Sequence, residues 1–205
     1  MEDSLRPDRA VQALHFFNNK PCAVLVPVLD VDGEEHLLFE QRSQKLTWQP
    51  GDICFPGGAI EKGDVSPLDA AFRETEEEIG IPRKDITYLG PLDYIESPIG
   101  VTLYPFAGKL HRSDFVISRG EIDELFTVPL AWFREHPPTE ELMDIATRPS
   151  DTFAPDLLAS HFQNDTSWRR RKTYSVYLYR WKDKYIWGIT AHIVKHFLSL
   201  YKGEK

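Results

Sequence analysis

The sequence contains little cysteine: Cys22 and Cys54 are the two cysteines among its 205 residues. Neither lies at a spacing typical of a metal site, which argues against a zinc-binding protein. Both lie among apolar residues, which favours buried free thiols over a disulfide framework. We therefore expect a protein of the cytoplasm.

Long apolar runs, repeats and an excess of positive charge are also missing. No run reaches the ~18 apolar residues of a membrane span, and no secretory signal begins the chain, so we expect no membrane partner. Asp and Glu outnumber Lys and Arg by 32 to 24, and the net charge is −8. This balance argues against a nonspecific nucleic-acid surface. An anionic substrate would have to be attracted by a local basic patch and by metal.

Length and composition indicate one domain over residues 1–205, because an apolar fraction of 41% is enough for a core. The order of apolar patterns predicts an α/β fold with a mixed sheet between helices. We expect a helical N-terminal extension over residues 1–20 and an irregular surface connection over residues 136–171. Further strands and helices are expected at Cys22–Leu29, His36–Gln41, Ile86–Tyr94, Thr102–Leu110, Leu125–Pro129, Leu130–Glu135, Tyr174–Trp181, Tyr185–Trp187 and Thr190–Tyr201.

A short helix with clear end signals is predicted in the middle of this pattern. Ser66 is a good N-cap, Pro67 suits the first helical position, and Asp69 stands where a capping-box acid would. Gly80 followed by Pro82 predicts the end of the helix.

Three acids share one face of this helix. Glu74, Glu77 and Glu78 stand at i, i+3 and i+4. The pair at i and i+4 repels by roughly 0.2–0.5 kcal/mol, and carboxylates near a helix C-terminus oppose the helix dipole. A bound cation would convert both penalties into attraction, and hard cations such as Mg²⁺ prefer oxygen ligands. The alternative is a solvated charge run in which Arg73 pairs with Glu77.

The stretch from Gly58 to Ile81 resembles the Nudix box, the pyrophosphate-cleaving motif of the Nudix hydrolase family. The family pattern is G-x5-E-x7-R-E-U-x-E-E-x-G-U, where U is a bulky aliphatic residue. Two positions depart from it: the middle acid is Asp64, with eight residues before Arg73, and Thr75 occupies the first U position. Glu61 is an alternative for the middle acid. The matching positions are Gly58, Arg73, Glu74, Glu77, Glu78, Gly80 and Ile81.

This resemblance implies an α/β/α sandwich and hydrolysis of a nucleoside diphosphate linked to a further group. It also implies that Mg²⁺ or Mn²⁺ is held by Glu74, Glu77 and Glu78, and that Arg73 orients the glutamates. Glu121 is our candidate for a further catalytic acid, because it precedes a strand where many relatives bring a loop acid over the metal. Glu124 is a weaker rival, and an ordinary loop acid is the alternative for both.

A second resemblance concerns the substrate. Residues 37–58 read LLFEQRSQKLTWQPGDICFPGG and are similar to the extension of Nudix enzymes that hydrolyse coenzyme A. Phe39 and Glu40 depart from it, since small hydroxyl residues are common there. The segment Ile186–Ala191, IWGITA, looks like the start of the last helix of the same subgroup. The resemblance implies cleavage of coenzyme A to 4′-phosphopantetheine and adenosine 3′,5′-bisphosphate.

The same extension contains the predicted substrate-binding residues. Arg42 and Ser43 follow an apolar strand, so the Arg42 guanidinium could contact phosphate oxygens. Gly57 and Gly58 allow a close approach of the backbone, whose N–H groups could face an anion. The alternative for Arg42 is a surface salt bridge with Glu40 or Asp52. The alternatives for Trp48, an anchor of the loop or a stacking face for a base, stay open.

Three functions fit these patterns. The first is a metal-dependent pyrophosphatase of coenzyme A. The second is another Nudix hydrolase, acting on ADP-ribose, NADH or a nucleotide. The third is a binding module that senses a nucleotide without cleaving it, against which the retained Arg73, Glu74, Glu77 and Glu78 argue. In each case the expected partner is a small nucleotide, and a homodimer is a further expectation.

Overall fold

The fold is given by a computed structural model that describes residues 17–203. Its larger sheet contains eight strands, β1 (Lys20–Val31), β2 (Glu34–Arg42), β3 (Ile53–Cys54), β4 (Gly57–Ala59), β5 (Ile86–Pro91), β6 (Ile95–Glu96), β7 (Val101–Leu110) and β8 (Ile122–Pro129). Strands β1 and β7 pair in parallel, and the other neighbours pair antiparallel. The sheet is therefore mixed, as the sequence predicted. The predicted N-terminal helix falls almost entirely on residues 1–16, outside the described residues.

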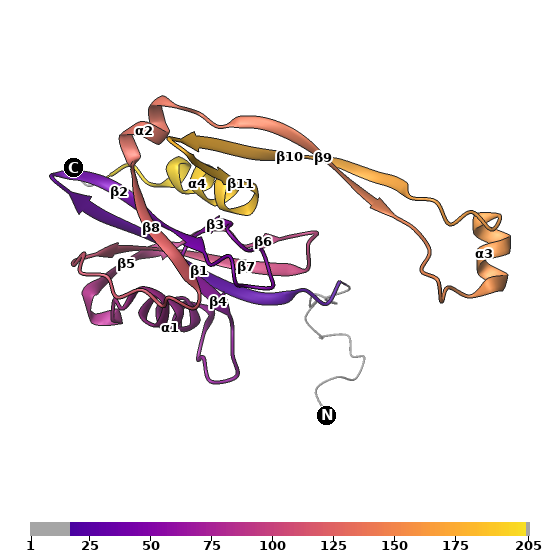
Figure 1. Cartoon of the computed structure of the whole chain (residues 1–205), viewed down its shortest axis with the longest axis horizontal. Helices are drawn as coiled ribbons and strands as arrows, with labels where there is room; N and C mark the ends of the chain where they lie inside the picture. The colour runs from indigo at the N-terminus through magenta and orange to yellow at the C-terminus, as the bar shows by residue number, and fades with distance from the viewer. Residues whose placement is uncertain (1–16, 204–205) are drawn as a thin grey trace, which may run out of the picture.

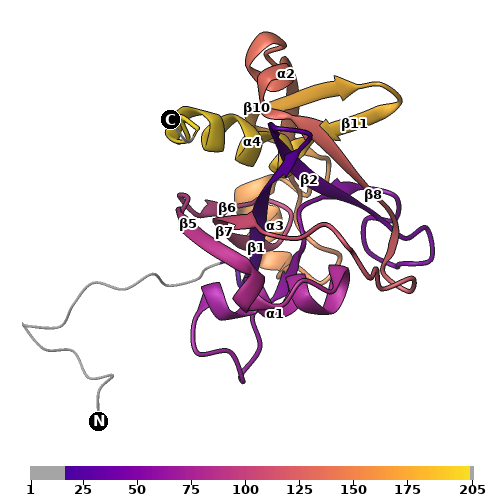
Figure 2. The ribbon, with the colours of Figure 1, turned by 90° about the vertical axis from the view of Figure 1, so that its left-hand side faces the viewer.

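Helices cover both faces of this sheet (Figures 1 and 2). The helices are α1 (Pro67–Ile79), α2 (Leu130–Glu135), α3 (Pro155–Phe162) and α4 (Gly188–Leu200), with a 3-10 turn at Arg83–Asp85. Strand β1 alternates between the two faces: Leu25 packs with Phe72 of α1, while Val26 packs with Val194 and Phe197 of α4. Each such fully buried side chain contributes about 1.5–3 kcal/mol relative to an exposed one. The α/β/α layering follows from this alternation.

Two hairpin turns agree with the sequence. Asp32 and Gly33 both have positive φ, 53° and 87°, and join Val31 to its partner Glu34. Positive φ at both central residues is the type I′ geometry that matches the twist of the flanking strands. The chain turns again at Lys182 and the residue after it, between β10 (Arg169–Trp181) and β11 (Lys184–Trp187).

The expectation of an irregular connection over residues 136–171 is wrong. This region contains strand β9 (Thr139–Thr147), helix α3 and the start of β10. Strands β9 and β10 pair antiparallel from Thr139↔Leu178 to Thr147↔Arg169, and with β11 they form a second, three-stranded sheet. Most side chains of β9 are exposed on both faces. The backbone ladder therefore forms without the alternating apolar pattern by which a strand is recognised.

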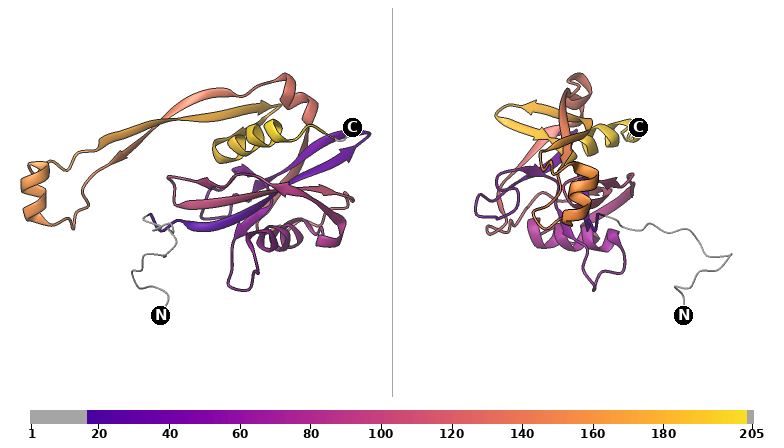
Figure 3. Two further views of the ribbon diagram at one scale, coloured as in Figure 1. Left: turned by 180° about the vertical axis from the view of Figure 1, so that it is seen from behind. Right: turned by 90° about the vertical axis from the view of Figure 1, so that its right-hand side faces the viewer.

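Residues 142–174, called here the arm, project from the body of the molecule and end in α3 (Figures 1 and 3). Cross-strand contacts support the ladder, such as the 2.5 Å hydrogen bond from the Thr173 hydroxyl to Asp144. At the tip, the rings of Phe153 and Phe162 pack edge to face, with centroids 5.4 Å apart. None of the helices within residues 17–203 has the length and apolarity that a membrane crossing requires.

Candidate active site

Helix α1 has the ends that its sequence predicts. The Ser66 hydroxyl accepts the N–H of Asp69 at 3.2 Å and donates to the carboxylate of the same residue at 2.8 Å. Gly80 ends the helix in the left-handed region, at φ 73°, and its N–H donates to the carbonyl of Glu76 at 3.0 Å. Thr75, at an aliphatic position of the motif, is fully buried. Its hydroxyl tolerates this position because it donates to the Ala71 carbonyl at 2.7 Å.

The three acids of α1 have different surroundings. Glu78 is 5% exposed, and its Oε2 accepts the N–H of Gly57 at 2.8 Å. The carboxylate of Glu74 lies against Gly58, where an added Cβ would be 2.5 Å from Oε1. The Glu77 side chain is 56% exposed. Strand β4 therefore positions Glu74 and Glu78, whereas Glu77 lies at the solvent side of the same helix face.

The N–H of Gly57 donates within the protein, and the substrate-binding role of Gly57 and Gly58 stays a prediction. The anion that the Gly57 N–H faces is Glu78 of the protein itself. At Gly58, the absent side chain makes room for the Glu74 carboxylate. Gly58 therefore allows β4 to approach α1 closely, whereas Gly57 allows β4 to approach β1, since an added Cβ at Gly57 would lie 2.3 Å from the Ala23 carbonyl oxygen.

Replacing Gly58 with alanine should damage activity more than stability. A Cβ there would lie 2.5–2.8 Å from the carboxylate atoms of Glu74, and a side-chain end can rotate away from such a clash. We expect kcat to fall by about ten-fold or more, because a misplaced acid loses its alignment, while the melting temperature (Tm) changes by a few degrees at most. Steady-state kinetics and thermal unfolding test this, with Gly63→Ala as the matched control, since the described residues leave open space around Gly63. Parental kcat in Gly58→Ala would contradict it.

Arg73 connects α1 to the preceding loop. Its Nε and Nη2 donate to the two carboxylate oxygens of Asp64 at 3.0 and 3.1 Å, and Nη1 donates to Glu74 at 2.8 Å and to Glu77 at 3.2 Å. Nη2 also donates to the Ala59 carbonyl at 3.1 Å. The hydrogen bond with Arg73 lowers the pKa of Asp64. The displaced acid of the motif, Asp64, therefore orients the arginine, and the arginine orients Glu74 and Glu77.

Strand β2 adds a carboxylate that the sequence did not assign to the site. Burial raises the pKa of Glu78, and the charge of Glu40 on β2 adds to this rise. Burial likewise raises the pKa of Glu40, with Glu121 and Glu74 adding to it. Burial also raises the pKa of Glu74, against the hydrogen bond from Arg73. A charged residue at the end of the apolar run LLF was the signal available in the sequence.

The donor set suits a hard divalent cation. All of its candidate ligands are carboxylate oxygens, and Glu40 Oε2 is a buried acceptor without a hydrogen-bond partner among the described residues. Within residues 17–203, however, no three acid, His or Cys side chains converge closely enough to enclose one metal ion. Glu77 is held by Arg73 instead. A cation shared by Glu74, Glu77 and Glu78 therefore requires these carboxylates to move towards one another.

The two candidate loop acids, Glu121 and Glu124, lie in different surroundings. Glu121 immediately precedes β8, its carbonyl accepts the N–H of Ser43 at 2.8 Å, and its charge contributes to the raised pKa of Glu74 and Glu78. It lies at the rim of the acidic face. The carboxylate of Glu124 instead pairs with Lys184 at 2.5 Å. Of the two candidates, Glu121 is the one that the structure places near α1.

Arg42 and Ser43 hold the loop that follows β2. The Ser43 side chain is fully buried, and its Oγ accepts the N–H of Lys45 at 3.4 Å, so it has no surface for a ligand. Arg42 donates to the Trp48 carbonyl at 3.3 Å, and its Nε is a buried donor without a partner among the described residues. Within residues 17–203, Arg42 forms no ion pair with Glu40 or Asp52. Both cysteines are free thiols, and they are partly rather than fully buried.

A hollow of about 410 Å³ lies where this loop meets β11. The Thr190 hydroxyl of α4 donates to the Ile53 carbonyl at 3.0 Å, which joins the loop to the start of the last helix. The residues that line the hollow come from two distant parts of the sequence, namely Gln41, Gly51, Asp52 and Ile53, and Asp183, Lys184, Tyr185 and Trp187.

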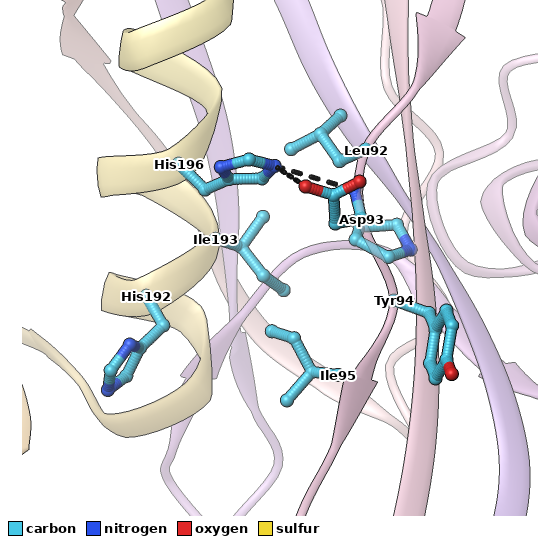
Figure 4. Close-up of a pocket in the computed structure, with 8 residues that line it drawn as sticks. Leu92, Asp93, Tyr94, Ile95, His192, Ile193 and His196 are labelled. Carbon is cyan, nitrogen blue, oxygen red and sulfur yellow. Dashed lines mark hydrogen bonds and ion pairs between the residues drawn. The ribbon is translucent and has the colours of Figure 1, made fainter.

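A smaller hollow of about 180 Å³ lies beside α4 (Figure 4). His196 pairs with Asp93 there at 3.1 Å, and Ile193 and Ile95 form an apolar wall. His192 points away from Asp93 and hydrogen-bonds the Ser175 carbonyl at 3.1 Å. This hollow is lined by α4, which covers the face of the sheet opposite to α1. It is therefore separate from the acidic face.

Comparison with known proteins agrees with this geometry. A profile described as the NUDIX domain matches residues 19–149. The uncharacterized Nudix hydrolase NudL of Pectobacterium atrosepticum is 31% identical over 187 residues, which cover 91% of this chain and 84% of the relative. NudL of Escherichia coli K12 is 30% identical over 193 residues, covering 92% and 85%.

The fold of a solved relative agrees as well. The crystal structure of a MutT/nudix family protein from Enterococcus faecalis superposes with a TM-score of 0.51 at 15% identity, over 89% of this chain and 62% of that one. The motif, the two-faced mixed sheet and the relatives support a pyrophosphohydrolase that acts on a nucleoside diphosphate derivative. The chain belongs to the Nudix hydrolase family.

Proposed function

We propose that the protein hydrolyses the pyrophosphate bond of coenzyme A or its derivatives, giving 4′-phosphopantetheine and adenosine 3′,5′-bisphosphate. The observation that supports this substrate is the meeting of the two stretches that resemble coenzyme A-hydrolysing enzymes. The first stretch, residues 37–58, supplies Gln41, Gly51, Asp52 and Ile53 to the lining of the 410 Å³ hollow. The second, Ile186–Ala191, supplies Trp187, and the Thr190–Ile53 hydrogen bond joins the two stretches. Two stretches so far apart in sequence share one function most simply if they bind one ligand.

The acidic face supports the proposed reaction. Glu74, Glu77 and Glu78 would hold Mg²⁺ or Mn²⁺, which would polarise the pyrophosphate and lower the pKa of the attacking water. Arg73 keeps Glu74 and Glu77 oriented through its hydrogen bonds. Glu121, at the rim, is our candidate for the carboxylate that accepts the proton of this water. Water adds to one phosphorus atom while the bond from that phosphorus to the bridging oxygen breaks.

Strand β2 connects the acidic face to the hollow. Glu40 lies towards α1, and the next residue, Gln41, lines the hollow. Arg42 is the last residue of the strand, and the Trp48 side chain beyond it is 54% exposed. We propose that Arg42 contacts a phosphate of the substrate and that Trp48 offers a stacking face to the base. The basic cluster Arg169–Lys172 lies instead on the arm, which projects away from α1 (Figure 1).

Coenzyme A should be cleaved at least ~10-fold better than 3′-dephospho-coenzyme A, measured as kcat/KM. A charge-assisted hydrogen bond to the 3′-phosphate is worth about 1.5–3 kcal/mol, which corresponds to roughly ten- to a hundred-fold. Arg42→Ala should reduce this ratio by weakening coenzyme A alone. Arg170→Ala, on the arm, is the matched control and should leave the ratio unchanged.

The outcomes of this comparison assign the phosphate contact. A ratio that survives in Arg42→Ala but falls in Lys45→Ala or Arg170→Ala would move the contact to that residue. Equal cleavage of both substrates by the parent enzyme would contradict the proposal. Faster cleavage of ADP-ribose or NADH would identify another nucleoside diphosphate derivative as the substrate.

A further inference from the structure

Glu40 is a buried carboxylate with one oxygen unaccounted for. It follows the fully buried Leu37, Leu38 and Phe39 on β2, and it is itself 1% exposed. Its Oε1 accepts a hydrogen bond from the Cys54 thiol at 3.1 Å. Its Oε2 is buried and has no partner among the described residues. Buried acceptors are almost always hydrogen-bonded, so this oxygen points to a missing partner.

The unpaired oxygen belongs to the side of the sheet that faces α1. Alternate residues of a strand share a face, and Leu38, two residues before Glu40, packs with Phe72 and Ile79 of α1. The charge of Glu40 acts on Glu78, and the charge of Glu74 acts on Glu40. Glu40 therefore lies on the face of β2 that α1 covers, within electrostatic reach of Glu74 and Glu78.

We propose that Glu40 is a further ligand of the divalent cation, contributing Oε2 from β2 while Glu74 and Glu78 move towards the ion from α1, since no three of the described acids already converge on one point. The Cys54 thiol, fixed by the β2–β3 pairing of Glu40 with Cys54, holds Oε1 and so orients the carboxylate. A cation is the partner that satisfies an unpaired anionic oxygen and screens the neighbouring acids at once. This inference rests on the metal-dependent reaction proposed above. It adds an acid at a position where small hydroxyl residues are common in similar enzymes.

The test is a titration of the metal-free protein with Mn²⁺, followed by the electron paramagnetic resonance signal of free Mn²⁺. Glu40→Gln keeps the shape of the side chain and the acceptor for Cys54 but removes the charge. Its Kd for Mn²⁺ should rise by about ten-fold or more, as should that of Glu78→Gln. Glu34→Gln, at the exposed start of β2, is the matched control and should bind as the parent does.

Thermal unfolding of the same variants separates a ligand from a structural residue. As a ligand, Glu40 destabilises the metal-free protein by repulsion, so Glu40→Gln should keep or raise Tm without metal and lose most of the rise that Mn²⁺ produces. A lower metal-free Tm with parental Mn²⁺ affinity would show a structural role, such as pairing with Arg42, and would overturn the proposal.

Two further comparisons complete the design. Parental Mn²⁺ affinity in both Glu40→Gln and Glu78→Gln would show that the cation does not bind at the acidic face. That result would contradict the proposed function as well. A loss of affinity in Glu78→Gln alone overturns the role of Glu40 alone. Cys54→Ala should raise the Kd, whereas Cys54→Ser, which keeps a donor, should bind as the parent does. Equal affinities of these two variants and the parent would overturn the orienting role of the thiol.

Discussion

Glu78→Gln should lower kcat by about a thousand-fold or more, equivalent to about 4 kcal/mol in the barrier. Glu78 is the most buried acid of α1, and the charges of Glu40 and Glu74 both raise its pKa further. Glutamine keeps an oxygen for the Gly57 N–H but removes the charge that would hold the cation. Because that charge is buried among other carboxylates, Tm without metal should stay the same or rise.

Steady-state kinetics with saturating Mg²⁺ or Mn²⁺ and metal-free thermal unfolding measure these two effects. Glu76→Gln is the matched control: Glu76 is an exposed acid on the same helix whose side chain points away from the acidic face. Glu77→Gln should also lower kcat, with little change in Tm because its side chain is 56% exposed. Near-parental turnover in Glu78→Gln would show that the acids of α1 do not hold the catalytic cation.

Gly57→Ala should lower the free energy of unfolding by about 2–4 kcal/mol. An added Cβ would lie 2.3 Å from the Ala23 carbonyl oxygen and 2.6 Å from Val24 Cα. These are backbone atoms of the central strand β1, which cannot rotate away as a side chain can. For a chain of this size the loss corresponds to a fall of about 5–15 °C in Tm.

Thermal unfolding of Gly57→Ala beside Gly63→Ala tests this. Gly63 lies in the same loop region with open space around it among the described residues, so its variant should keep the parental Tm. Activity should fall in Gly57→Ala as well, because the N–H of residue 57 positions Glu78. Equal Tm values of the two variants would mean that β4 can move away from β1 without cost.

The parts of the fold that local chemistry encodes were predictable from the sequence. The limits of α1 follow from Ser66 and Gly80, and the turn at Asp32 and Gly33 follows from residues that tolerate positive φ. The two-faced sheet follows from its buried strands. The family motif identified the acidic face because its residues lie close together in the sequence.

Which of the acids are buried and which are exposed was not predictable in the same way. Helical spacing places Glu74, Glu77 and Glu78 on one face, but it does not say which of them a neighbouring strand will cover. Burial of Glu78 and exposure of Glu77 arise from the approach of β4. Sheet pairing with β3 brings Glu40 against Cys54, a contact that spans fourteen positions of the sequence.

The arm shows a different limit. A strand is recognised from sequence when buried and exposed residues alternate along it. The residues of β9 do not alternate in this way, because most of them are exposed. Its ladder depends on β10, a partner that begins more than twenty residues later. No local window of sequence contains that information.

The tip of the arm is also a place where the backbone could be cut without separating the two parts of the fold. Residues 148–168 join β9 to β10 far from the two faces of the larger sheet, whereas the chain after them returns to the core through Ile186, Val194 and Phe197. Lengthening this loop should cost little stability, because the entropic cost of closing a loop grows only with the logarithm of its length. A proteolytic nick at the tip would therefore leave two fragments that remain associated through the core. The same tip is a natural place for new chain ends or for an inserted domain.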